Sequence, residues 1–199
     1  FGLAVTGEAP IANVKRNDTA KPGDVLLLTK PIGVGILATA MKRGLMKPEH
    51  AAIGTRVMSS LNRAGQSLGA LKSVHAMTDV TGFGLLGHVI ELCEGSGLSA
   101  DLVFDRVPVI SEARQYLAAG AYPDGSFRNW KSYSAKVRGA SDMERMMLLS
   151  DPQTSGGLLI ACSRENVDEV MATCSIDGQE ATVIGEMRAF VDSNRVFVL

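Results

Sequence analysis

The chain has 199 residues, of which 46% are apolar and 21% charged, and its formal net charge at pH 7 is −1. This apolar share is enough to bury the core of one large domain, or of one domain with a small subdomain. A charge balance this close to neutral gives no electrostatic basis for binding nucleic acid or an anionic membrane surface. We therefore expect neither nucleic acid nor a membrane among the partners.

The elements follow one another in a regular order along the chain. Segments rich in Val, Ile and Leu predict strands at 1–7, 24–29, 76–80, 98–104, 158–162, 181–187 and 195–199. Apolar residues spaced three and four apart predict helices at 35–45, 48–68, 82–94, 111–119, 142–150 and 164–174. Turn-forming residues and the only Trp fill 120–141, which we interpret as a long surface loop or flap. The pattern predicts an α+β fold, a layered α/β/α domain on a mixed sheet.

The three cysteines and three histidines limit the metal and redox chemistry. Cys93, Cys162 and Cys174 are far apart and form no Cys-x-x-Cys pair, and the histidines are scattered as well. A zinc site needs closely spaced ligands, so we expect none. We interpret the thiols as free and mostly buried, as in a reducing cytoplasm. No segment has the pattern of a membrane span or a secretory leader.

The first ten residues, FGLAVTGEAP, lack an initiating Met and begin at once with strand-like residues. A domain seldom begins inside a strand. From this we expect the chain to be the C-terminal part of a longer protein.

An aspartate stands at the end of a predicted strand in the stretch MTDVTGFGLLGH, residues 77–88. In one interpretation Asp79 caps the next helix by accepting N–H bonds from Thr81 or Gly82. In the other, the carboxylate lies at the rim of a sheet and holds a hard cation such as Mg²⁺, while the backbone after it approaches and binds an anion. The stretch is neither a dinucleotide fingerprint nor a Walker A loop.

A second polar stretch, DPQTSGG at 151–157, precedes a buried strand. Asp151 starts a turn, Thr154 and Ser155 supply hydroxyls, and Gly156 and the glycine after it permit unusual backbone angles. The stretch is either an ordinary polar turn or a nest of N–H and OH donors for a phosphate.

A third candidate is Lys30 in LTKPIGVG, residues 28–35. Either it meets a phosphate as a point charge, next to a helix N-terminus that adds donors, or it is a solvated lysine at a strand end.

Four stretches together resemble the C-terminal half of the selenophosphate synthetase family, also called selenide, water dikinase. They occur in the family's order and span residues 2 to about 187, and they read GLAVTGEAP, GDVLLLTKPIGVGILATAMKRGL, AMTDVTGFGLLGHVIELCEGSG and LLSDPQTSGGLLIAC. The combination of MTDVTGFGLLGH with DPQTSGG separates this family from its relatives in the aminoimidazole ribonucleotide synthetase superfamily.

The resemblance implies an enzyme that converts selenide, ATP and water to selenophosphate, AMP and phosphate. It implies Mg²⁺, a cytoplasmic homodimer, and a nucleotide held between an N-terminal ATP-binding half and a C-terminal half. The family's magnesium-binding aspartate falls on Asp79. By the same resemblance, residues 1–199 form the C-terminal domain, with 1–7 as the last strand before or at the domain junction and the N-terminal ATP-binding domain absent.

The family's reactive cysteine or selenocysteine and its partner lysine belong to the N-terminal half. We therefore expect no catalytic residue in this chain, and an inactive fragment. Two alternatives stay open. One is another ATP-dependent enzyme of the superfamily, acting in purine biosynthesis or hydrogenase maturation. The other is a non-catalytic domain that serves packing or partner binding.

Overall fold

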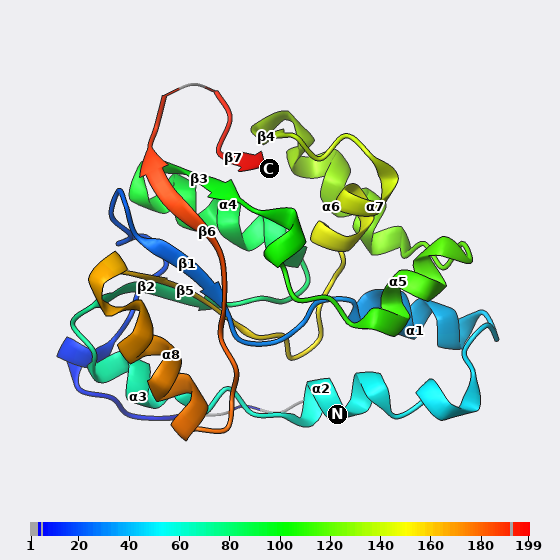
Figure 1. The fold of residues 1–199 in the computed structure, drawn as a ribbon, viewed down its shortest axis with the longest axis horizontal. Coiled ribbons are helices and arrows are strands. Elements are labelled where there is room, and N and C mark those ends of the chain that lie inside the picture. The colour runs from blue at the N-terminus through cyan, green and yellow to red at the C-terminus, as the bar shows by residue number, and fades with distance from the viewer. Residues whose placement is uncertain (1–3, 5, 192) are drawn as a thin grey trace.

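One mixed seven-stranded sheet organises the chain in the computed structural model, which describes residues 4, 6–191 and 193–199 (Figure 1). Its strand order is β2-β5-β1-β6-β3-β7-β4. The strands are β1 (Val25–Leu28), β2 (Val74–Asp79), β3 (Leu98–Leu102), β4 (Val137–Arg138), β5 (Leu158–Cys162), β6 (Thr182–Ala189) and β7 (Val196–Val198). Strand β7 runs parallel to both of its neighbours, and the other pairs are antiparallel.

Helices cover both faces of this sheet, as Figure 1 shows. They are α1 (Val34–Lys42), α2 (Ile53–Ser59), α3 (Ala64–Ala70), α4 (Gly84–Ser96), α5 (Ser111–Ala118), α6 (Asp124–Tyr133), α7 (Met143–Leu149) and α8 (Val167–Ile176). Side chains along β1 alternate between two cores: Leu26 and Leu28 join the core under α1, α4, α5 and α7, whereas Val25 and Leu27 join the core under α3 and α8. This alternation is the period of two expected of a strand buried on both faces. The predicted α/β/α layering on a mixed sheet is confirmed.

The helix predicted at 48–68 is not continuous. It is a short 3-10 turn (Pro48–His50), then α2, then α3. The break follows Ser60, which adopts extended backbone angles. The apolar residues spaced three and four apart in this segment therefore do not share one buried face. Ile53, Val57 and Met58 are partly buried, Ala64 is buried, and Leu61 is 66% exposed.

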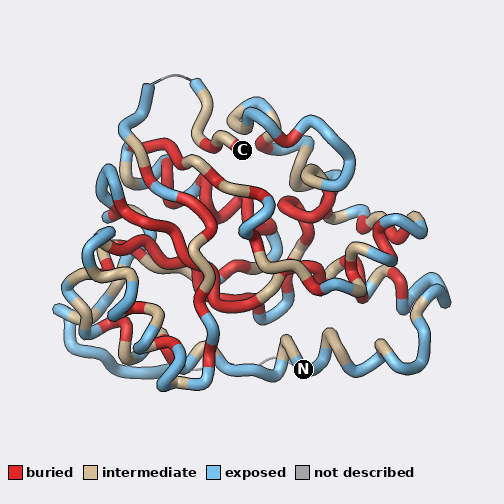
Figure 2. Tube along the Cα trace, in the orientation of Figure 1, coloured by how far each residue is buried: buried red, intermediate tan, exposed pale blue. Residues whose placement is uncertain are grey.

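The prediction of a surface loop at 120–141 is also wrong. Helix α6, a 3-10 turn (Ser134–Lys136) and strand β4 fill most of it. Its turn-forming residues mislead because packing decides the conformation here: Tyr133 is buried in the larger core, and Trp130 packs against that core. Figure 2 shows buried trace within this segment as well as in the sheet.

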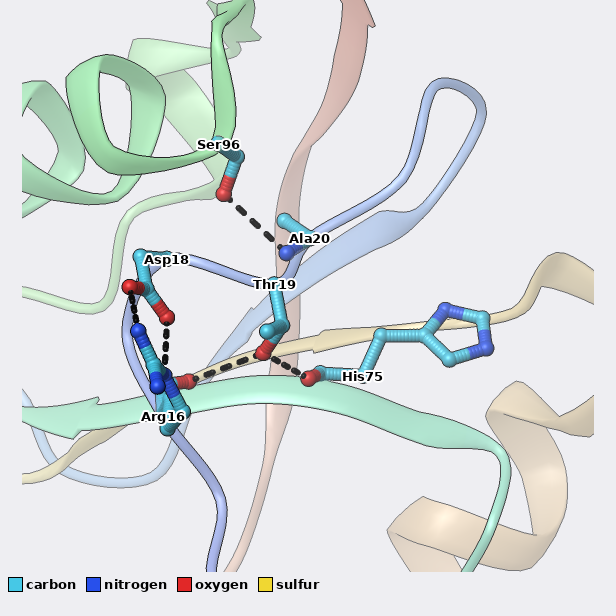
Figure 3. Close-up of polar contacts among 6 residues, drawn as sticks. All are labelled: Arg16, Asp18, Thr19, Ala20, His75 and Ser96. Atoms are coloured by element: carbon cyan, nitrogen blue, oxygen red, sulfur yellow. Dashed lines mark hydrogen bonds and ion pairs between the residues drawn. The ribbon is translucent and has the colours of Figure 1, made fainter.

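The segment before β1 closes the outer edge of β2. Arg16 O accepts the N–H of Met77 at 3.1 Å, and the hydroxyl of Thr19 donates to His75 O at 2.7 Å. Figure 3 shows the Thr19 contact together with the bond from Ala20 N to Ser96 Oγ, 3.0 Å long, which ties the segment to the end of α4. An edge strand covered in this way offers few free backbone groups for unwanted pairing.

The strand predicted at 1–7 falls partly outside the described residues, since 1–3 and 5 are not described. Residues 4, 6 and 7 belong to no strand.

Candidate functional site

The sheet brings the three polar stretches to one edge. Strands β1 and β2 both pair antiparallel with β5, so both end where β5 begins. Lys30 follows β1, Asp79 ends β2, and residues 151–157 lead into β5. Two backbone bonds link the latter two stretches: Val80 N donates to Gly157 O at 2.9 Å, and Gln153 N donates to Thr81 O at 3.0 Å.

Asp79 is an exposed side chain at this edge. No hydrogen bond or ion pair from the described part of the chain reaches its carboxylate. Helix α4 begins after Phe83 without a side-chain cap, and the Thr81 N–H donates to His88 rather than to Asp79. Asp79 therefore does not cap α4, and its oxygens are free to bind a ligand. Gly82 lies beside it on the same turn, exposed, and a side chain there would meet no atom within 4 Å.

His88 is the buried support of this turn, a role that the sequence analysis missed. Only 6% of His88 is exposed; its Nε2 accepts the Thr81 N–H at 3.0 Å, and its Nδ1 lies 2.9 Å from Glu91 Oε2. Because Nε2 accepts a backbone N–H, the imidazole proton is on Nδ1, where it donates to Glu91. The sequence signal that could have indicated this role is a single histidine within the apolar helical stretch GLLGHVI, residues 84–90.

Asp151 lies inside the protein and caps helix α1 from across the fold. Its Oδ2 accepts the Gly35 N–H at 3.0 Å and an N–H of Gln153 at 2.8 Å, and Gln153 Oε1 accepts the N–H groups of Gly33 and Val34. Burial of the carboxylate raises the pKa of Asp151 to about 7, opposed by its hydrogen bonds to Gln153 and to the start of α1. The other oxygen, Oδ1, has no partner among the described residues. Asp151 thus faces α1 rather than the exposed rim.

The tip of the DPQTSGG loop is exposed at residues 154 and 155, whereas the two glycines that follow are buried. Thr154 and Ser155 are exposed, and Ser155 has a φ of 51°, in the left-handed region. The backbone N–H groups from Thr154 to Gly157 donate to no described residue. Side chains at either glycine would overlap neighbouring backbone, Val80 O for Gly156 and Lys30 N for Gly157, so the tight contact between stretches requires glycine.

Lys30 is neither solvated nor exposed. It is 5% accessible, and its ammonium group donates to Ser60 O at 2.6 Å and to Ser155 O at 2.8 Å. Desolvation by burial lowers the pKa of the Lys30 ammonium. The side chain therefore joins the break before α3 to the DPQTSGG loop.

Two residues of helix α6 make three contacts here that the sequence did not indicate, because their segment was interpreted as a loop. Asn129 Nδ2 donates to Gly82 O at 2.8 Å and to Ser150 O at 3.0 Å, and the Tyr133 hydroxyl donates to Phe83 O at 3.0 Å. Burial raises the pKa of Tyr133 to about 12, so this donor keeps its proton at neutral pH.

The cysteines offer no nucleophile. Cys93, Cys162 and Cys174 are buried and free, and desolvation raises the pKa of their thiols to about 12, 12 and 11. The reactive form of cysteine is the thiolate, which these surroundings disfavour.

No group of three or more His, Cys, Asp or Glu in the described ranges is arranged to hold a metal ion. Mg²⁺ does not need such a group, since it is usually held by one or two carboxylates together with phosphate oxygens and water. The exposed, unpartnered carboxylate of Asp79 fits that mode. In the described residues, no helix is both long and apolar enough to cross a membrane.

The fold and these motifs define a class of protein. The sequence model of the AIR synthase related protein, C-terminal domain, matches residues 21–193, and the chain belongs to this family. Within it, the chain resembles selenide, water dikinase. It is 48% identical over 199 residues to that of Aeromonas salmonicida (strain A449), covering 100% of this chain and 57% of the relative. It is 50% identical over 187 residues to that of Enterobacter sp. (strain 638), covering 94% of this chain and 54% of the relative. The chain thus spans about half the length of these curated relatives.

Solved structures share the fold at much lower identity. Thiamine-monophosphate kinase from Stenotrophomonas maltophilia K279a has a TM-score of 0.66 at 18% identity, over 92% of this chain and 52% of that one. The hydrogenase maturation protein HypE in complex with ATP has a TM-score of 0.65 at 19% identity, over 92% of this chain and 48% of HypE. These likenesses establish the architecture alone.

Proposed function

We propose that this chain is the C-terminal half of a selenide, water dikinase, which uses ATP to phosphorylate selenide and releases AMP and phosphate. The observation that carries the proposal is the identity of about one half to selenide, water dikinases along essentially the whole chain. A hydrogenase maturation protein, HypE, which represents one of the alternatives, shares the fold at only 19% identity.

In this proposal Asp79 is a ligand to Mg²⁺ on the ATP phosphates. Its exposed carboxylate, with no partner of its own in the described structure, supports the role. Bound Mg²⁺ neutralises charge on the phosphates, which is much of what phosphoryl transfer requires. The remaining ligands come from the nucleotide, from water and from the N-terminal half.

The rim beside Asp79 contacts the phosphates through backbone groups. Thr81 and Gly82 follow Asp79 on one turn, and the free N–H groups of Thr154, Ser155 and Gly156 lie on the loop bonded to that turn. A run of unpaired N–H groups that includes one left-handed residue is a common anion-binding arrangement. Two buried residues hold this rim from the protein interior: Asp151 accepts the N–H of Gly35 in α1, and Lys30 donates to Ser155 O.

The proposal extends to the whole protein. The reactive cysteine or selenocysteine belongs to the N-terminal half, the enzyme is a homodimer in the cytoplasm, and water is the second phosphoryl acceptor after selenide. The chain alone then binds Mg²⁺–ATP weakly and catalyses nothing.

The test is the reaction of the full-length protein. Incubation with ATP, Mg²⁺ and selenide should yield AMP and a selenophosphate signal in ³¹P NMR, and omission of selenide should remove the signal. The 199-residue chain under the same conditions should yield neither product. Consumption of ATP that ignores selenide but responds to a purine-pathway or hydrogenase-maturation substrate would favour the superfamily alternative instead.

A further inference from the structure

Lys30 is a buried cation held entirely by backbone carbonyls. Its ammonium donates to Ser60 O and Ser155 O at 2.6 and 2.8 Å, and no carboxylate is paired with it in the described structure. A buried ammonium is costly unless its N–H groups are bonded, so these two carbonyls fix its position. Lysine has three N–H donors, and two of them are used here.

Asn62 makes an equivalent contact one peptide further on. Its Nδ2 donates to Gly156 O at 2.9 Å. Its own Oδ1 accepts from Gln179 Nε2 at 3.3 Å, and Gln179 Oε1 accepts the N–H of Ala64 at 3.2 Å. Gln179 is 5% exposed, so the orientation of the Asn62 amide is set from the protein interior.

These two bonds fix the direction of two successive peptide groups. In a planar trans peptide the carbonyl and the following N–H point in opposite directions. With Ser155 O directed at Lys30 and Gly156 O at Asn62, the N–H groups of Gly156 and Gly157 point away from those side chains. Neither N–H donates to a described residue.

The same bonds explain an unfavourable backbone angle. Ser155 is the only residue other than glycine with a positive φ in the described ranges. A left-handed conformation costs a non-glycine residue free energy and persists only where its surroundings enforce it. Lys30 and Asn62 hold the carbonyls on that residue and the next, and so enforce it.

We propose that Lys30 and Asn62 are positioning residues: they hold the peptides after Ser155 and Gly156 with their N–H groups turned to bind an anion, and Lys30 itself does not contact that anion. The identity of the anion as an ATP phosphate rests on the proposed function. The orientation of the loop does not depend on the proposed function.

The test compares Lys30→Met and Asn62→Asp with two exposed control variants, Lys72→Met and Asn17→Asp. The first readout is the ¹⁵N–¹H signals of Gly156 and Gly157 in the 199-residue chain without ligand. The second is its affinity for Mg²⁺–tripolyphosphate, measured by the movement of those signals at several KCl concentrations.

We expect both test variants to displace the two glycine signals before ligand is added, and to weaken tripolyphosphate binding about tenfold, as the loss of one orienting hydrogen bond predicts. In Lys30→Met the dependence of affinity on KCl should stay as in the wild type, because no charge contact with the anion is lost. The controls should change neither readout. If Lys30→Met does not fold, Asn62→Asp carries the test.

Three results would overturn the proposal. A weaker salt dependence in Lys30→Met would mean that the ammonium contacts the anion directly. Unchanged affinity and unchanged glycine signals in both variants would mean that neither residue orients the loop. Wild-type signals that ignore tripolyphosphate would mean that the loop binds no anion. Failure of the proposed function looks different: the full-length protein makes no selenide-dependent AMP, while the variants still displace the glycine signals.

Discussion

The carboxylate of Asp151 accepts the backbone N–H of Gly35 at 3.0 Å, across 116 positions of sequence. Helix α1 thus begins on an acid supplied by the loop before β5, with Gln153 bonding the two preceding N–H groups. The first N–H groups of a helix have no partners within the helix and attract negative charge. This contact ties α1 to the DPQTSGG loop, and so to the proposed phosphate site.

Gly35→Ala should break this contact. The new Cβ would lie 2.5 Å from Asp151 Oδ1 and 2.7 Å from Pro152 O. We expect the free energy of unfolding to fall by about 1–3 kcal/mol, the usual range for overpacking. Gly54→Ala is the matched control in α2, since its Cβ would meet only Leu37 Cδ1 at 3.8 Å. That variant should gain about 0.5–1 kcal/mol from helix propensity. Urea denaturation measures both, and equal stability of the two variants would count against the tight contact.

Asp151 should make the protein less stable as pH rises. Its pKa is raised from 3.8 to about 7 in the folded protein, so between these values the folded state holds a proton that the unfolded state has lost. Stability from this group is therefore fully present below about pH 4 and is lost as pH rises toward about 7, by at most about 4 kcal/mol. Asp151→Asn removes the titration and still offers an oxygen to Gly35.

The measurement is urea unfolding of wild type and Asp151→Asn at pH 5 and pH 8. The variant should gain stability relative to wild type on going from pH 5 to pH 8. A constant difference between the two proteins at both pH values would show that the Asp151 carboxyl does not titrate in this range.

His88→Ala should loosen the turn that carries Asp79. The half-buried Thr81 N–H would lose its acceptor, at a cost of about 1 kcal/mol for the loss of one hydrogen bond. We expect the Thr81 amide proton to exchange with solvent faster in this variant, as measured by NMR. His50→Ala is a suitable control, because its imidazole contacts the Tyr116 hydroxyl instead. Equal Thr81 exchange in wild type and His88→Ala would contradict the supporting role.

The three thiols should be inert in the folded protein. All are buried, and their pKa values lie at about 11–12. A thiol-reactive dye at pH 7.5 should label none of them natively and all three after denaturation in urea. Rapid labelling of the native chain would contradict the burial of these side chains.

The sequence predicted the layers well because their signal is local. Strands β1 and β5 are short runs of large apolar residues, and α4 has a clear apolar pattern closed by Gly97, which adopts the left-handed conformation at the helix end. The two errors, at 48–68 and 120–141, come from long-range contacts. Ser60 is extended where its carbonyl meets Lys30, and α6 forms on a sequence rich in turn residues because Tyr133 packs into the core.

The candidate site was predictable only in part, for the same reason. Asp79 and DPQTSGG are visible as polar residues at strand ends. Asp151 faces inward and Lys30 bonds to two carbonyls because of partners that are distant in sequence. His88 accepts the Thr81 N–H because of the geometry of one turn, which residue spacing does not specify.

The most direct test of the account is Asp79→Asn in the full-length protein, with selenide-dependent AMP formation measured across a range of Mg²⁺ concentrations. Asp105→Asn is the control, another exposed aspartate with no partner among the described residues, on the connection after β3. Both variants should keep wild-type stability. We predict that kcat/KM falls roughly 100-fold or more in Asp79→Asn alone, because metal stabilisation of the phosphates is worth several kcal/mol, and that added Mg²⁺ restores part of the loss. Wild-type activity and Mg²⁺ dependence in Asp79→Asn would contradict the metal role on which the account rests.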